Sequence, residues 1–284
     1  MDRLYPAIDI RWSTPPDAGR VEQLLAILDD EAPTAVEERD SGIAVFFAGA
    51  DERDRAAGIA RDFAPDATVT PVSVSDEAWA ERSQASITAI RVGRIVVTPP
   101  WARRGTSPDE DIVITIVPSM GFGTGHHAST RLCLQLLQAQ PVAASSVLDV
   151  GTGSGVLALA AWRLGATRVV GIDIDIDALT SARENVDVNG GDSTVELRVV
   201  DLARASDEFV GGFDLVLANL TGAMLERYSH ELCSLVASGG SLIASGFQEA
   251  EESAVRRALE AGGAKAIAGH VEEDHWVAIH LTMA

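Results

Sequence analysis

A glycine-rich stretch near the middle of the chain has the residue types and spacing for cofactor chemistry. Gly151, Gly153 and Gly155 follow the run 146–150, which is typical of a short buried strand, and precede the apolar run 156–162. Glycine permits positive φ angles and lets a ligand approach the backbone closely. A helix that begins there presents free N–H groups. The stretch therefore predicts a strand, a tight turn and a helix that bind a nucleotide-like cofactor.

The spacing of the glycines separates two classes of cofactor. Dinucleotide-binding folds use G-x-G-x-x-G, whereas here the third glycine is Gly155 and the fingerprint's last position is Val156. G-x-G-x-G preceded by Asp149 resembles the loop of class I methyltransferases, which wraps the amino-acid end and ribose of S-adenosylmethionine. An NAD-dependent oxidoreductase and a non-catalytic binding module that keeps the fold remain the alternatives.

Two acidic residues follow the next expected strands. Asp173 ends the run 168–173, 22 residues after Gly151. An acid at the C-terminal tip of the second strand can accept hydrogen bonds from both ribose hydroxyls, and the alternative is a solvated loop acid. Asp201 follows the third expected strand, where class I methyltransferases often contact adenine.

Asn219 is the candidate catalytic residue. It follows the buried run 213–218, and a polar side chain at such a strand end faces the ligand crevice of an open α/β sheet. Its carbonyl oxygen could hold a substrate nitrogen; the alternative is a turn residue. A protonated substrate amine must lose its proton before its nitrogen can attack a methyl group. Because no side chain is clearly placed as a base, we expect proximity and orientation to dominate.

The elements around these residues predict two domains. From residue 111 to 284, strand patterns alternate with helical ones, which favours a mostly parallel sheet covered on both faces. Residues 1–75 show the order β-α-β-β-α-β of a ferredoxin-like domain. Residues 76–110 are expected to form a linker that merges into the second domain, and within it the alternation over Ile87 to Val97 predicts strands.

Composition limits the partners of this chain. The net charge is −20, which argues against a nucleic-acid or anionic-membrane footprint and suits a basic protein partner, or simply serves solubility. No apolar run approaches the ~18 residues of a membrane span, and no signal peptide is visible. Cys133 and Cys233 are isolated, which suggests a reducing compartment, so a cytoplasmic protein is expected. The adjacent His126 and His127 have no third ligand nearby, so no metal is expected.

Four motifs together resemble the bacterial ribosomal protein L11 lysine methyltransferases. The resemblance covers nearly the whole chain and is most specific in its second half. The matching motifs are Phe122-Gly123-Thr124-Gly125-His126-His127-Ala128-Ser129-Thr130, Asp149 to Gly155, Gly171-Ile172-Asp173-Ile174-Asp175 and Ala218-Asn219-Leu220, with weaker echoes at Trp79, Ser245-Gly246-Phe247 and Glu272-Glu273-Asp274-His275-Trp276.

The resemblance implies a cofactor, a substrate and a set of site residues. It implies S-adenosylmethionine-dependent methylation of lysine or amino groups on ribosomal protein L11, with the acidic N-terminal domain docking that basic protein. A monomer is expected. Another protein or a small molecule is the alternative substrate. The residues expected at the cofactor are Phe122, Gly123, Thr130, Asp149, Gly151, Gly153, Gly155, Asp173 and Asn219.

Overall fold

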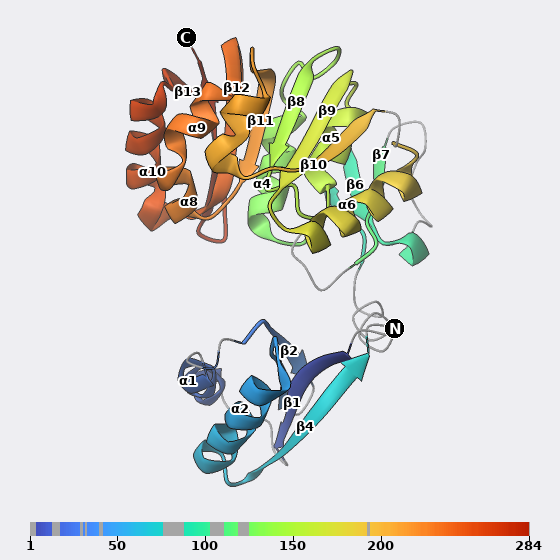
Figure 1. Cartoon of the computed structure of the whole chain (residues 1–284), viewed down its shortest axis with the longest axis vertical. Coiled ribbons are helices and arrows are strands. Elements are labelled where there is room, and N and C mark those ends of the chain that lie inside the picture. The colour runs from blue at the N-terminus through green and yellow to red at the C-terminus, as the bar shows by residue number, and fades with distance from the viewer. Residues whose placement is uncertain are drawn as a thin grey trace. The chain divides into compact units, whose positions relative to one another are not determined.

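The chain forms two compact units, Met1–Ser86 and Ile87–Ala284. The computed structural model in Figure 1 describes residues 4–12, 18–28, 31, 33–39, 42–75, 88–102, 111–118, 125–191 and 194–283. In this part of the chain, no helix combines the length and the apolar character needed to cross a membrane.

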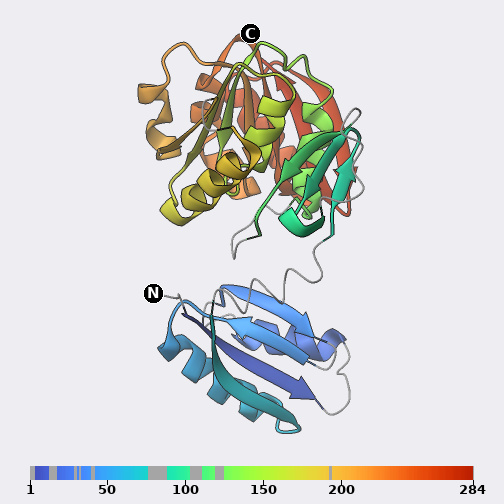
Figure 2. The same ribbon diagram turned by 90° about the vertical axis from the view of Figure 1, so that its right-hand side faces the viewer.

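The first unit is an antiparallel sheet in the order β2-β3-β1-β4 with two helices on one face, as Figure 2 shows. This confirms the predicted β-α-β-β-α-β order. Alanines at 56, 57 and 60 are buried on the second helix, so this helix approaches the sheet closely. The elements are β1 (Leu4–Trp12), α1 (Ala18–Leu28), β2 (Ala35–Arg39), β3 (Gly42–Phe46), α2 (Ala50–Phe63) and β4 (Ala67–Ser75).

The second unit contains a seven-stranded sheet in the order β10-β9-β8-β11-β12-β14-β13. The first five strands in that order pair in parallel, and β14 pairs antiparallel with both of its neighbours. The strands are β8 (Ser146–Val150), β9 (Arg168–Asp173), β10 (Val195–Val199), β11 (Phe213–Asn219), β12 (Val236–Gln248), β13 (Ala266–Glu273) and β14 (Trp276–Thr282). The chain turns in opposite directions from β8, to β9 on one side and β11 on the other, which is where open α/β sheets bind ligands.

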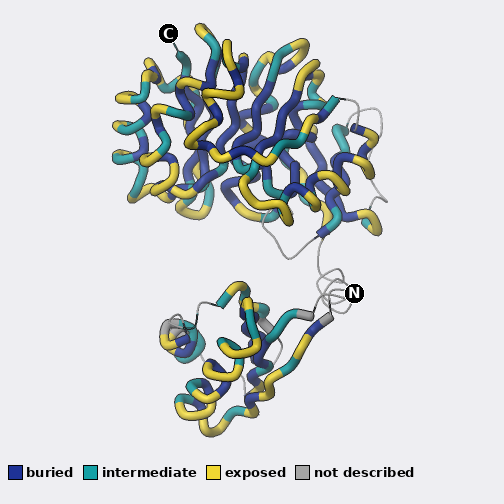
Figure 3. The backbone as a smooth tube through the Cα atoms, in the orientation of Figure 1, coloured by how far each residue is buried: buried dark blue, intermediate teal, exposed yellow. Residues whose placement is uncertain are grey.

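Helices bury both faces of this sheet, and Figure 3 shows the buried central strands. Along β8, Val147 belongs to one core cluster, whereas Leu148 and Val150 belong to the other, because successive strand residues point to opposite faces. The helices are α4 (Ala128–Leu137), α5 (Val156–Arg163), α6 (Ile176–Asn189), α7 (Ala205–Glu208), α8 (Gly222–Arg227), α9 (Ser229–Ser234) and α10 (Glu249–Gly262), with short 3-10 turns at Pro100–Ala102 and Leu202–Arg204.

Within the stretch expected as a linker, residues 88–102 belong to the second unit and contain strands, as the alternation over 87–97 predicts. β5 (Ile90–Val92) and β6 (Ile95–Thr98) join β7 (Ile112–Thr115) in a separate three-stranded sheet. β5 and β6 form an antiparallel pair, while β6 and β7 run parallel, so the second unit begins near Ile87 rather than at residue 111. Pairing of β6 with β7 is long-range, and local turn signals such as Pro99-Pro100 did not indicate it.

Candidate functional site

The glycine loop connects β8 to α5 as the sequence predicts. Gly151, Gly153 and Gly155 have φ angles of 67°, 53° and 80°, a region that disfavours side chains. At Gly151 a Cβ atom would lie 2.6 Å from Cδ2 of Leu220, so the backbone there also passes close to the end of β11. The loop therefore lies at the carboxyl end of the sheet, and its three glycines add no side chains between the backbone and a ligand.

Asp149 lies beneath the loop, where it cannot present its carboxylate to a ligand. The residue is 1% exposed, and its Oδ2 accepts hydrogen bonds from Thr152 Oγ1 at 2.7 Å and from the Ala158 N–H at 3.1 Å. The sequence interpretation counted Asp149 as a cofactor contact; the structure instead gives it the role of holding the loop to the first turn of α5. Burial, together with the charge of Asp173, raises the pKa of Asp149 to about 6.

This raised pKa predicts how stability changes with pH. An aspartate has a pKa of about 3.9 when unfolded, so between that value and about 6 the folded protein holds one more proton than the unfolded chain. The Asp149 contribution therefore makes the free energy of unfolding fall as the pH rises through this window. Asp149→Asn keeps an acceptor oxygen but does not titrate. We expect the variant to gain about 3 kcal/mol relative to wild type between pH 4 and pH 7.

Denaturant unfolding of both proteins across this pH range measures the effect. Comparing the two proteins at each pH removes the contribution of the other titrating groups. If the free energies of unfolding of the two proteins changed equally between pH 4 and pH 7, the raised pKa of Asp149 would be contradicted.

Asp173 joins the loop from the neighbouring strand. One carboxylate oxygen accepts from the Gly153 N–H and the other from the Asp175 N–H, both at 3.0 Å. The acid therefore sits at the C-terminal tip of β9 with an orientation set by two backbone donors. Asp175 caps α6 through the Asp177 N–H, as expected for an acid at that position. Asp201 caps a 3-10 turn by accepting from the Ala203 N–H.

Asn219 and Thr130 meet at the same edge of the sheet although 89 residues separate them. Asn219 Nδ2 donates to Thr130 Oγ1 at 3.2 Å. Thr130 is only 3% exposed, so its hydroxyl is a fixed partner. The donation occupies the amide nitrogen side and leaves the side-chain oxygen of Asn219 as an acceptor. Of the other predicted site residues, Phe122 and Gly123 lie outside the described residues.

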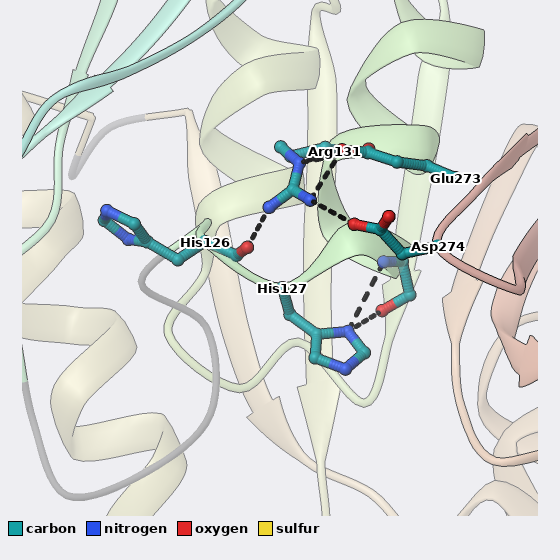
Figure 4. A network of polar contacts seen from close by, with 6 residues as sticks. His126, His127, Arg131, Glu273 and Asp274 are labelled. Carbon is teal, nitrogen blue, oxygen red and sulfur yellow. Dashed lines mark hydrogen bonds and ion pairs between the residues drawn. The ribbon is translucent and has the colours of Figure 1, made fainter. Parts of the chain in front are cut away.

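His127 positions the first turn of α4, on which Thr130 lies. Its Nδ1 accepts from the Ser129 N–H at 3.3 Å, which caps the helix, and its ring lies 4.4 Å from the Trp276 ring in an edge-to-face contact. Burial, and then the charge of Arg131, lower the pKa of His127 and so favour its neutral form. In Figure 4, the rings of His126 and His127 point to opposite sides. The described residues contain no group of acids, histidines and cysteines able to hold a metal ion.

The β13–β14 hairpin is attached to this same helix start, a contact that the sequence did not reveal. Arg131 donates to both carboxylate oxygens of Glu273 at 2.7–3.0 Å and to the His126 carbonyl oxygen (Figure 4). Asp274 and His275 form the tight turn with φ angles of 49° and 66°, values that residues other than glycine seldom adopt. The only signal in the sequence was the weak echo at Glu272 to Trp276, which suggested no partner.

Comparisons with known proteins agree with this geometry. A family model described as ribosomal protein L11 methyltransferase (PrmA) matches residues 22–284. The chain is 38% identical over 221 residues to the ribosomal protein L11 methyltransferase of Geotalea daltonii, with 74% of this chain and 68% of that protein covered. It is 32% identical over 252 residues to the Deinococcus radiodurans protein of the same name, covering 85% of this chain and 86% of that protein.

A solved structure supports the same relationship. The ribosomal protein L11 methylase of Lactobacillus delbrueckii subsp. bulgaricus is similar with a TM-score of 0.62 and 28% identity, over 69% of this chain and 98% of that one. For some relatives the aligned region covers a smaller share of the protein. The alignment with the ribosomal protein L11 methyltransferase of Geobacter metallireducens, at 45% identity, covers 68% of this chain and 62% of that protein. The second unit is thus a Rossmann-like class I methyltransferase sheet, and the chain belongs to the ribosomal protein L11 methyltransferase family.

Proposed function

We propose that this protein transfers methyl groups from S-adenosylmethionine to amino groups of ribosomal protein L11. The observation that carries the proposal is the hydrogen bond from Asn219 to Thr130. It leaves the side-chain oxygen of Asn219 as an acceptor for a substrate amine, at the sheet edge where Asp173 contacts the glycine loop. Family membership supports both the cofactor and the substrate class.

The residues present fit this cofactor. Its ribose hydroxyls need an acceptor, and the Asp173 carboxylate at the strand tip accepts only two backbone hydrogen bonds in the described contacts, fewer than its oxygens can hold. Its amino-acid end needs a backbone that a ligand can approach closely, which glycines at 151 and 153 provide; at Gly151 a side chain is also excluded by Leu220, whose Cδ2 lies 2.6 Å from where a Cβ would be. Gly153 completes the set that would hold it, and Thr130, which is 3% exposed, would act through its hydrogen bond with Asn219. When bound, S-adenosylmethionine supplies a methyl group activated by the sulfonium.

The protein's own contribution to the reaction is orientation. The side-chain oxygen of Asn219 would accept an N–H of the substrate amine and direct the nitrogen lone pair along the line of displacement. Thr130 keeps the Asn219 amide in one orientation through its buried hydroxyl. A site that excludes water lowers the pKa of an amine and so favours its neutral, nucleophilic form. Asp149 is enclosed beneath the loop and does not act as the base.

The first unit would recognise the protein substrate. Residues 1–75 contain 15 acidic and 7 basic residues, a net charge of −8. Such a surface speeds the encounter with a basic protein through long-range attraction, which salt screens. We expect kcat/KM for the protein substrate to fall as NaCl is raised, while the Kd for S-adenosylmethionine changes little. Steady-state kinetics at increasing NaCl would test this, and a salt-independent kcat/KM would contradict it.

Mass spectrometry of a reconstituted reaction tests the proposed function. Purified full-length protein, S-adenosylmethionine and recombinant ribosomal protein L11 should give products heavier by whole methyl groups, located by peptide mapping. Labelled cofactor with a cell extract distinguishes the alternatives. Labelling of another protein would overturn the L11 assignment, and failure to bind the cofactor would overturn the enzymatic proposal. We also propose that the protein acts as a monomer in the cytoplasm and does not bind nucleic acid; sedimentation checks the first point.

A further inference from the structure

We propose that Asn185 of α6 positions the glycine loop for the cofactor, whereas the side chain of Asn189, one turn later, holds β7 and does not bind the loop. The inference rests on the proposed function, because it concerns the loop assigned to S-adenosylmethionine. Neither asparagine belongs to the motifs that indicated the site.

Asn185 connects the loop to the backbone beyond β7. It is 0% exposed, its Nδ2 donates to the Ser154 carbonyl oxygen at 2.9 Å, and its Oδ1 accepts from the Val117 N–H at 2.7 Å. Both ends of one buried amide are therefore bound to backbone groups of segments 37 residues apart in sequence. A buried amide with both ends satisfied has a single orientation, so it fixes both partners.

Asn189 makes contacts to β7 and to its own helix, and among the described residues its side chain forms no hydrogen bond with the glycine loop. Its Oδ1 accepts from the Thr115 N–H at 2.9 Å, and its Nδ2 donates to the carbonyl oxygens of Thr115 and Asn185 at 2.6 and 2.7 Å. Because residues four apart lie on one face of a helix, Asn189 binds the last residue of β7 and Asn185 binds the backbone two residues beyond it. β7 is the edge of its three-stranded sheet, and these two side chains bind the backbone edge where a further strand would pair.

The contact at Ser154 determines the geometry of the loop. Ser154 is 4% exposed and lies between Gly153 and Gly155, which both have positive φ angles and many accessible conformations. The Ser154 carbonyl and the Gly155 N–H belong to one planar peptide unit, so fixing the carbonyl also fixes the N–H. That N–H donates to the Thr152 carbonyl oxygen at 2.8 Å and closes the turn.

The loop is therefore held on two sides. Asp173 binds the Gly153 N–H from β9, and Asn185 binds the Ser154 carbonyl from α6. Removing the second contact would let the turn sample other conformations, so cofactor binding would have to restore the order.

Alanine substitution at the two asparagines separates loop positioning from strand packing. Asn185→Ala and Asn189→Ala should both lower the Tm, because each removes buried hydrogen bonds to the backbone at or just beyond the end of β7. Only Asn185→Ala should weaken binding of S-adenosylmethionine, by about tenfold in calorimetric Kd, the effect of one lost hydrogen bond. In the cofactor-free protein, hydrogen exchange at the Gly155 amide should be faster in Asn185→Ala than in Asn189→Ala.

Each possible result decides between these roles. An unchanged Kd in Asn185→Ala, or equal weakening in both variants, would overturn the inference while the proposed function stands. Wild-type protein that does not bind S-adenosylmethionine would overturn the proposed function, and the exchange comparison would still decide whether Asn185 orders the loop. Should Asn185→Ala fail to fold, Asn185→Gln, which keeps the amide on a longer side chain, replaces it in the same comparison.

Discussion

Asn219→Ala should lower kcat about 100-fold while the Kd for S-adenosylmethionine stays within about threefold of wild type. The alanine removes the oxygen that would orient the substrate amine, an interaction that matters most in the transition state. It leaves the glycine loop and Asp173 in place, so most of the cofactor contacts remain. Single-turnover rates with ribosomal protein L11, together with calorimetric binding of the cofactor, separate the two quantities.

Two further variants make this result specific to the amide oxygen. Thr130→Val removes the hydroxyl that accepts from Asn219 Nδ2 at 3.2 Å and frees the amide to turn, so it should lower kcat by a smaller factor. Thr130→Ser keeps the hydroxyl and should stay near wild type. If Asn219→Ala turned over as fast as wild type, the orienting role of this residue would be wrong.

Asp173→Ala should raise the Kd for S-adenosylmethionine about 100-fold. The alanine removes two kinds of interaction. It removes the hydrogen bonds that the carboxylate would accept from the ribose hydroxyls, and it removes the one that the carboxylate accepts from the Gly153 N–H at 3.0 Å. A hydrogen bond to a charged group contributes about 1.5–3 kcal/mol, so losing the ribose contacts alone accounts for this factor. With the cofactor at saturation, much of the turnover should return. Titration calorimetry and kinetics at increasing cofactor concentrations measure both effects.

Asp175→Asn is the matched control for the loss of negative charge in Asp173→Ala. It removes one carboxylate two residues away, while asparagine still caps α6 through the Asp177 N–H. We expect its Kd to remain near wild type. Equal weakening in Asp175→Asn and Asp173→Ala would indicate a general electrostatic effect and exclude a specific ribose contact.

The cofactor edge could be predicted from the sequence because its signals are local. The glycines at 151, 153 and 155 adopt the positive φ angles that their lack of a side chain permits. Asp173 and Asn219 could be placed at strand ends because apolar runs end there, and parallel strands align their carboxyl ends at one edge. The order of elements in the first unit followed in the same way from hydrophobic periodicity and turn residues.

Contacts across long sequence separations needed the tertiary structure. The sequence did not show that Thr130 accepts from Asn219, that β6 pairs with β7, or that Arg131 binds Glu273. Each of these contacts depends on which strands become neighbours and at what register, and no local pattern specifies that. For the same reason the start of the second unit near Ile87, well before residue 111, needed the structure.

Burial changed the roles of residues whose types were already visible. Asp149 stands directly before the glycines, and only its enclosure shows that it supports the loop from below. Asn185 and Asn189 are ordinary polar residues in the sequence, spaced by one helical turn. Their function arises because the fold places backbone groups of Val117, Ser154 and Thr115 within hydrogen-bond reach of their amides. Side-chain types and local spacing thus determined what chemistry the chain offers, whereas packing decided which groups are enclosed and which meet the ligand, because enclosure depends on every surrounding element at once.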